Sequence, residues 1–420
     1  MATNQSYKNH SIWFWLVAII ILTLYNLTPP IDGFDTQYYF LAGERLWNGQ
    51  LDCLRTPVYP LLLKLFNVCF GDRGGVAGIV ILQSAVYLLS VASLHNIARL
   101  AIKNRLIQMA VTFLYVICVA PGWCNELMTE SLSISGCVII ADLICRYIQR
   151  PSAKTSIGIF LITLFLVFIR PSFIFLFAIL PFVWIVLWLR RANQMLHLLS
   201  LVLSILCFST YLGYCKVYEK EYGIFTSSIS FICNDIYNLQ RSAAWNTDKV
   251  SNTETRFFLD SIANNVNYAP VYNAISTNHK MLPMIVQGCK EIKAGSEKAL
   301  RRHQIEITAA SFDKRFNASV NTHTPLSAIL FTCSLFLTLP LSLFYGITII
   351  ACIALVVYFL RNRTIPLMAT VIILFTAAQC SGILLYASEA HERLLLPVYP
   401  LSLVLLGVTI EKTLHFINNN

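Results

Sequence analysis

Polar side chains that could perform chemistry gather in the loop after the first apolar segment. The apolar run 12–27 is about the length that a bilayer requires of a helix, so the loop following it is expected at the membrane surface. That loop combines two carboxylates, a tyrosine pair and an arginine: Asp32, Asp35, Tyr38, Tyr39 and Arg55. A positioned carboxylate can take the proton of a hydroxyl as its oxygen attacks an electrophile.

Each residue of this loop also has a simpler interpretation. Asp35 could instead cap the helix expected from Thr36. Asp32 lies in Pro-Ile-Asp-Gly, which is typical of a turn, although it could help to hold an acceptor or a metal ion. Tyr38 and Tyr39 are either anchors at the membrane–water interface or a packing surface for a sugar ring.

Arginines are the second group of candidates, because fixed cations stabilise negative charge that develops in a reaction. Arg55, Arg170 and Arg393 are the candidates. Arg170 ends an apolar run immediately before Pro171, so its alternative role is to extend its charge to the interface.

Three more polar residues flank these arginines along the chain. Glu130 could orient an arginine or bind an acceptor, whereas Glu126 is expected to be a solvated loop residue. His391 could hydrogen-bond a phosphate or simply lie at the interface, beside Glu392.

Taken in chain order, these motifs resemble the GT-C class of integral-membrane glycosyltransferases. Within that class they look most like the superfamily of protein O-mannosyltransferases and lipid A aminoarabinose transferases. The resemblance covers 12–217 and 340–410, and it rests on Asp35, Tyr38-Tyr39, Ala42, Leu46, Gly49, Arg55-Thr56-Pro57, Tyr59-Pro60-Leu61-Leu62, Thr129-Glu130-Ser131-Leu132, Arg170-Pro171, Glu392-Arg393-Leu394-Leu395-Leu396-Pro397 and Tyr399-Pro400.

The resemblance implies a function and a set of site residues. A sugar would move from a polyprenyl-phosphate donor to an acceptor hydroxyl, with inversion and with Asp35 as the base. Substrate would be bound by Arg55, Tyr38, Tyr39, Glu130, Arg170, His391, Glu392 and Arg393. Some members of this class use a divalent cation and others do not. Asp32, Asp35 and Glu130 form no ligand motif, so neither a metal nor another cofactor is predicted.

Composition predicts an all-α polytopic membrane protein. The chain is 56% hydrophobic and 12% charged, with a mean hydropathy of +0.63. The net charge of +10 does not indicate nucleic-acid binding, because the cations lie mainly in short loops between apolar runs. By the positive-inside rule they place both termini in the cytoplasm, and the site then faces the extracytoplasmic side of the cytoplasmic (inner) membrane.

The apolar runs predict about ten transmembrane helices, interfacial helices in the first outer loop, and one long extracytoplasmic loop. The interfacial helices are expected over 36–47 and 57–70, and 326–339 as a partial helix. The expected parts are an N-terminal membrane module, 1–217, whose first outer loop is 29–56, an extracytoplasmic segment, 218–323, and a C-terminal membrane module, 324–420. Within the middle part, 290–308 suits a helix, and Cys233 and Cys289 could pair in an oxidising space.

Two other classes of protein compete with this interpretation. An O-antigen polymerase or ligase would also use a polyprenyl-linked donor, but it would leave the carboxylates of the first loop without a role. A lipid or solute transporter usually places charge near the bilayer midplane and shows internal repeats, whereas this chain places charge at the ends of its apolar runs. Besides the lipid donor, the expected partners are membrane lipid and an acceptor that is a glycan, a lipid or a protein.

Overall fold

The protein, described here from a computed structural model, is built from helices. The structure describes residues 3–27, 29–30, 32–33, 35–117, 120–242, 244–263, 273–275, 277–316, 338–362, 366–386 and 391–419. Over these ranges the chain forms α- and 3-10 helices and no named β-strand, which confirms the predicted all-α class.

The membrane part contains helices from both ends of the chain. Seven helices in the described part of the chain are long and apolar enough to cross a bilayer, and three shorter apolar helices accompany them. The helices of this part are α1 (Thr3–Asn26), α3 (Val58–Ala101), α4 (Arg105–Ile117), α5 (Ala120–Cys124), α6 (Glu130–Gln149), α7 (Ala153–Ile169), η1 (Pro171–Phe175), α8 (Leu176–Leu189), α9 (Gln194–Tyr222), α16 (Leu341–Asn362), α17 (Leu367–Tyr386), α18 (His391–Leu394), η4 (Leu396–Val398) and α19 (Tyr399–Asn419).

Helix α3 contains a break at the point where the sequence predicts two separate segments. Gly71 has a φ of 71°, a left-handed conformation that is open to glycine and costly for other residues. The expected interfacial segment 57–70 lies on one side of this break, and the expected span lies on the other. The helix predicted over 36–47 is α2 (Thr36–Trp47), with the predicted bounds.

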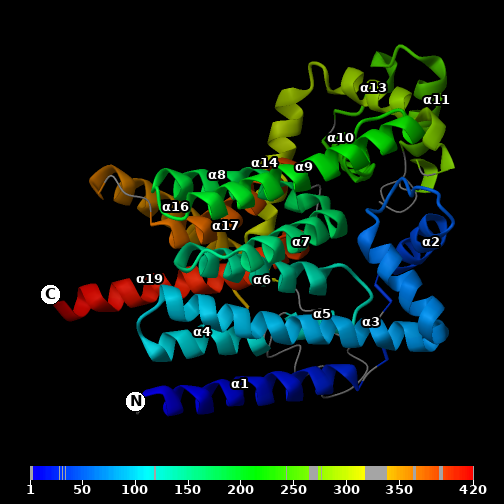
Figure 1. The fold of residues 1–420 in the computed structure, drawn as a ribbon. Coiled ribbons are helices and arrows are strands. Elements are labelled where there is room, and N and C mark those ends of the chain that lie inside the picture. The colour runs from blue at the N-terminus through cyan, green and yellow to red at the C-terminus, as the bar shows by residue number, and fades with distance from the viewer. Residues whose placement is uncertain are drawn as a thin grey trace.

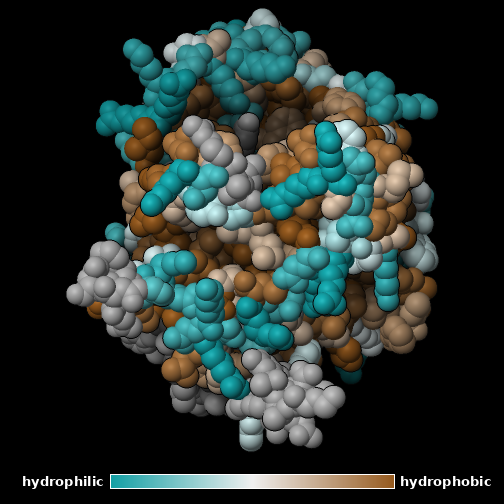
Figure 2. All heavy atoms as spheres, turned by 60° about the vertical axis from the view of Figure 1, so that its left-hand side comes forward, coloured by the Kyte–Doolittle hydropathy of each residue, from teal (hydrophilic) through white to brown (hydrophobic). Residues whose placement is uncertain are grey.

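The two ends of the helix bundle differ in what they carry. Both termini lie at one end, and α2 lies at the other (Figure 1). Figure 2 brings the side nearer the termini forward, where hydrophilic side chains are spread over an otherwise hydrophobic surface. This arrangement is the one expected of a chain whose two termini lie on the same side of a membrane.

A second, smaller group of helices projects at the α2 end (Figure 1). We call it the outer domain, residues 218–316, and it contains α10 (Ser230–Arg241), η2 (Thr247–Lys249), α11 (Thr253–Ile262), η3 (His279–Met281), α13 (Leu282–Lys293) and α14 (Glu297–Ser311). It has its own hydrophobic core, which includes Ile232, Leu259 and Ile285. Cys53 and Leu54 of the first loop belong to the same core.

The outer domain differs in detail from the sequence-based expectations. The single helix expected over 290–308 is divided between α13 and α14 by a turn at Gly295, whose φ is 76°. Cys233 and Cys289 are both buried and both free thiols. The partial helix expected over 326–339 lies almost entirely outside the described residues.

Candidate active site

Helix α2 holds the candidate catalytic loop against the membrane helices α3 and α6. Its inner face carries Tyr39, which packs edge-on against Tyr59 of α3 with 5.0 Å between ring centroids. A side chain at Gly43 would come within 2.7 Å of the Pro60 carbonyl oxygen, so glycine permits the close approach of α2 to α3. The hydroxyl of Thr36 donates to the carbonyl oxygen of Leu127 at 3.0 Å, which fixes the start of α2 against the loop before α6.

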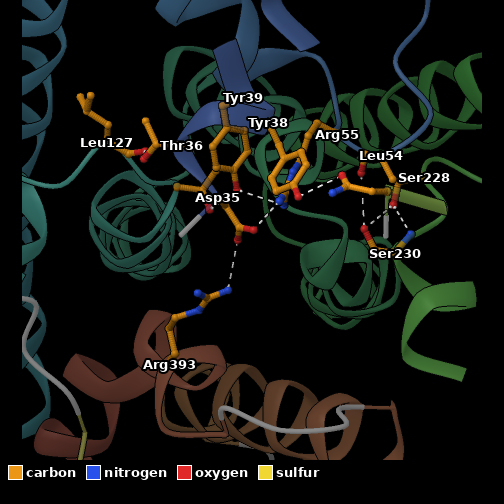
Figure 3. Close-up of polar contacts among 12 residues, drawn as sticks. Asp35, Thr36, Tyr38, Tyr39, Leu54, Arg55, Leu127, Ser228, Ser230 and Arg393 are labelled. Atoms are coloured by element: carbon orange, nitrogen blue, oxygen red, sulfur yellow. Dashed lines mark hydrogen bonds and ion pairs between the residues drawn. The ribbon is translucent and has the colours of Figure 1, made fainter. Parts of the chain in front are cut away.

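Asp35 immediately precedes α2, but its side chain makes no capping hydrogen bond. Only its backbone carbonyl participates in the first turn, where it accepts from Tyr38 and Tyr39. The carboxylate instead contacts Arg55 at 2.6 Å and Arg393 at 3.4 Å, and the two guanidinium groups approach it from different sides (Figure 3). The interpretation of Asp35 as a helix cap is therefore wrong for its side chain.

Glu130, the first residue of α6, is the second carboxylate of the site and is 1% exposed. Its Oε1 lies 3.3 Å from Nη2 of Arg170 and 3.2 Å from Nε of Arg393. Arg393, from the C-terminal part of the sequence, thus bridges two carboxylates that both come from its N-terminal third. Arg170 is paired in the interior, so its charge does not simply extend to the interface.

We refer to Asp35, Arg55, Glu130, Arg170 and Arg393 as the charge cluster. All five were predicted as site residues, and the structure brings them together in a chain of alternating charge. Three arginines and two carboxylates leave one net positive charge. An excess positive charge in a partly buried site favours an anionic ligand such as a phosphate.

Arg55 is positioned by its neighbour Thr56 and by Asp52, which the sequence analysis did not single out. The carboxylate of Asp52 accepts hydrogen bonds from the backbone N–H groups of Leu54 and Arg55, at 2.9 and 2.8 Å. The hydroxyl of Thr56 donates to the carbonyl oxygen of Ile169 at 3.1 Å, which joins the loop to the residue before Arg170. The signal for Asp52 was its place in Asp-Cys-Leu-Arg, since aspartate often bonds to the backbone a few residues ahead.

The two tyrosines of α2 have different surroundings. Tyr39 is buried, its ring lies 4.5 Å from the Arg55 guanidinium, and its hydroxyl is 3.4 Å from Nη1 of Arg55. It is therefore part of the site's interior and not an exposed interface anchor. Tyr38 is partly buried, and its hydroxyl donates to the side chain of Asn273 in the outer domain at 3.1 Å.

The arginines control the proton affinity of Asp35. Burial alone would raise the pKa of this carboxyl, but Arg55 and Arg393 outweigh that effect and lower the pKa below its ordinary value of 3.8. For Arg393, burial opposes the charged form, yet Glu130 and Asp35 raise its pKa overall. In this arrangement Asp35 is a carboxylate at neutral pH, and it is a weak base while both arginines hold it.

The corner formed by α18 lies beside the charge cluster. His391 is 1% exposed, and its Nδ1 lies 3.4 Å from the hydroxyl of Tyr345. Glu392 is paired with Lys314, with 3.3 Å between Nζ and Oε1. His391 is therefore an interior residue, and Lys314 is a cation near the site that the sequence analysis missed.

Two predictions about loop acids have different outcomes. Glu126, expected to be solvated, is only 7% exposed, and its carboxylate lies where a side chain at Gly33 would be. Asp32 is exposed on the loop before α2, and the ion pairs found among the described residues do not include it.

The donor atoms of the site do not fit a divalent cation. Arg393 lies between the carboxylates of Asp35 and Glu130, and each of these carboxylates also has a second arginine. Within the described ranges, no group of three or more His, Cys, Asp or Glu side chains could hold a metal ion. The expected metal independence stays a prediction.

Comparison with known proteins gives likeness at the level of structure. No protein-family model matches the chain, and no curated protein matches its sequence. The oligosaccharyltransferase of Archaeoglobus fulgidus in complex with zinc and sulfate aligns with 96% of this chain and 49% of its own, at a TM-score of 0.51 and 12% identity. The same enzyme tethered to an acceptor peptide containing the NVT sequon aligns with 96% of this chain and 50% of its own, at a TM-score of 0.51 and 11% identity.

The present chain thus spans about half the length of these solved structures. At such low identity the likeness concerns the fold, and it agrees with the GT-C resemblance seen in the sequence motifs. The chain is a helical, multi-pass membrane protein, and its fold resembles that of the archaeal oligosaccharyltransferase, a GT-C membrane glycosyltransferase.

Proposed function

We propose that this protein is a glycosyltransferase that transfers a sugar from a polyprenyl-phosphate donor to an acceptor hydroxyl, with inversion at the anomeric carbon. The observation that carries the proposal is the charge cluster, in which a carboxylate from the first loop and an arginine from the last loop meet inside a GT-C fold. Such a transfer needs a base for the proton of the acceptor and cations for the departing phosphate. Asp35 is the candidate base, and the arginines that converge beside it are the cations.

In the proposed reaction, Asp35 accepts the proton of the acceptor hydroxyl while that oxygen forms a bond to the anomeric carbon. The bond between that carbon and the phosphate oxygen breaks at the same time, and its electron pair leaves with polyprenyl phosphate. A single displacement of this kind inverts the configuration. Cations close to the departing phosphate stabilise its charge in the transition state.

A change within the charge cluster could make Asp35 a stronger base. Arg393 is the more exposed of its two partners, at 32%, and makes the longer contact, 3.4 Å against 2.6 Å for Arg55. A donor phosphate would compete for this guanidinium and loosen its hold on Asp35. The pKa of Asp35 would then rise when donor is bound, so the base would become effective in the complex that needs it.

The first test concerns the donor. Purified protein would be incubated with undecaprenyl-phosphate-linked sugars or with the matching nucleotide sugars, together with candidate peptide, glycan and lipid acceptors. A peptide is included because the solved oligosaccharyltransferase was captured with an acceptor peptide. Transfer from the lipid-linked donors alone supports the proposal, and transfer from nucleotide sugars contradicts it.

We further propose that the site faces the extracytoplasmic side of the cytoplasmic membrane and that the outer domain governs the choice of acceptor. Cys69 tests the orientation, because it is exposed and lies just before the break at Gly71, near the α2 end. A membrane-impermeant maleimide added to intact cells should modify the Cys69 peptide, as read by mass spectrometry. Modification only after the cells are opened would reverse the orientation.

A further inference from the structure

Lys314 lies at the junction between the outer domain and the last loop of the membrane part. Its Nζ is 3.3 and 3.4 Å from the two oxygens of Glu392, and half of its side chain is exposed, whereas that of Glu392 is 13% exposed. Two other lysine ion pairs are shorter: Lys293 lies 2.6 Å from Asp235, and Lys64 lies 2.6 Å from Glu44. The Lys314 ammonium is therefore held near α18 by a long contact that a stronger anion could replace.

The backbone around Lys314 is fixed to the start of α16. The carbonyl oxygen of Lys314 accepts from the N–H of Leu341 at 2.9 Å, and that of Phe312 accepts from Ser342 at 3.1 Å. Nη1 of Arg315 donates to the carbonyl oxygen of Thr338 at 3.1 Å. These contacts fix the backbone position from which the Lys314 side chain extends.

Two other groups on α18 flank the residue that Lys314 contacts. Arg393 follows Glu392 and reaches Asp35, with a third of its side chain exposed. His391 precedes Glu392, and its Nε2 is buried without a hydrogen-bond partner among the described residues. A buried polar atom without a partner carries a free-energy cost, which a ligand at this corner could remove.

We propose that Lys314, with Arg393 and His391, forms a binding subsite for the phosphate of polyprenyl phosphate, so that the outer domain contributes directly to the donor site. This inference rests on the proposed function. It adds a role in the donor site to the role in acceptor choice proposed above for the outer domain. On binding, the phosphate replaces the Glu392 carboxylate as the partner of the Lys314 ammonium and accepts a hydrogen bond from His391.

Binding of undecaprenyl phosphate to the full-length protein in nanodiscs tests this subsite, with undecaprenol and inorganic phosphate as comparison ligands. Lys314→Met should weaken binding of undecaprenyl phosphate about tenfold, the worth of one charge-assisted contact at a half-exposed position. Lys314→Arg should restore most of it. Lys293→Met is the matched control, because Lys293 lies in the same outer domain but is paired with Asp235 of α10.

The possible outcomes separate the subsite from the proposed function. If wild type binds undecaprenyl phosphate more tightly than undecaprenol, and Lys314→Met binds it equally well, the subsite is refuted while the function stands. If wild type binds the two lipids equally, both proposals are overturned. Glu392→Gln provides a reciprocal check, because removal of the competing carboxylate should tighten binding in wild type and have no such effect in Lys314→Met. Competition by inorganic phosphate alone would show that the subsite recognises the anion without its lipid.

Discussion

The replacement Asp35→Asn tests the chemistry most directly, because it keeps the shape of the side chain and removes its capacity to accept a proton. The proposed mechanism predicts that turnover falls by about two to four orders of magnitude, the usual worth of general-base catalysis. The structure also predicts a loss of stability. Asp35 is 9% exposed and pairs with two arginines, so the variant leaves three arginines of the charge cluster with one carboxylate. The loss of a charge-assisted contact at a buried position is worth about 1.5–3 kcal/mol.

A matched control separates these two effects. Asp142 of α6 is also a buried aspartate, 2% exposed, and it pairs with Arg146 at 2.6 Å, outside the charge cluster. Asp142→Asn should therefore lower the melting temperature by a similar amount while most of the turnover survives. Both variants would be purified in one detergent and assayed for transfer from an undecaprenyl-phosphate sugar and for thermal unfolding. If Asp35→Asn keeps turnover within threefold of Asp142→Asn, Asp35 is not the base and the mechanism fails.

Four more outcomes follow from the cluster. Glu130→Gln should destabilise the protein by about 3–5 kcal/mol, because it leaves Arg170 and Arg393 without their common carboxylate; a melting temperature equal to that of wild type would contradict this. Because the pKa of Asp35 is lowered below 3.8, its charged form stabilises the fold above about pH 4, and this contribution is lost as pH falls through the lowered pKa. For the same reason kcat/KM, which reports the free enzyme, should stay level from about pH 7 to pH 5. The acid limb of kcat, which reports the donor-bound enzyme, should lie at higher pH than that of kcat/KM. Coincident acid limbs would argue against release of Arg393 by the donor. Extensive treatment with EDTA should leave transfer unchanged, and a loss that manganese or magnesium restores would show that the site takes a metal after all.

Much of this site could be predicted because its residues lie in short motifs that the chemistry constrains. The motifs identified Asp35, Arg55, Glu130, Arg170 and Arg393, but they could not show that the carboxylates hold the arginines in alternation. That pattern depends on the meeting of loops more than 350 residues apart in sequence, as in the contact of Asp35 with Arg393.

Other features were hidden for a similar physical reason. Tyr39 looked like an interface anchor because burial is a tertiary property, and only the packing of α2 on α3 places its ring inside. Lys314 lies 78 residues before its partner Glu392 and in a segment outside the family resemblance, so no local pattern marks it. The helical spans were easier, because apolar length alone predicts them.

The hydrophobic core shared by the first loop and the outer domain limits how this protein can be rebuilt. Cys53 and Leu54 pack in the core of the outer domain, and the hydroxyls of Tyr218 and Tyr222 donate to the carbonyl oxygens of Cys53 and Leu51 at 2.7 Å. An exchange of residues 218–316 between relatives would cut through that core. It would also displace Arg55, the residue that directly follows Leu54. A chimera that aims to change only the acceptor must therefore carry residues 51–54 together with the domain they support.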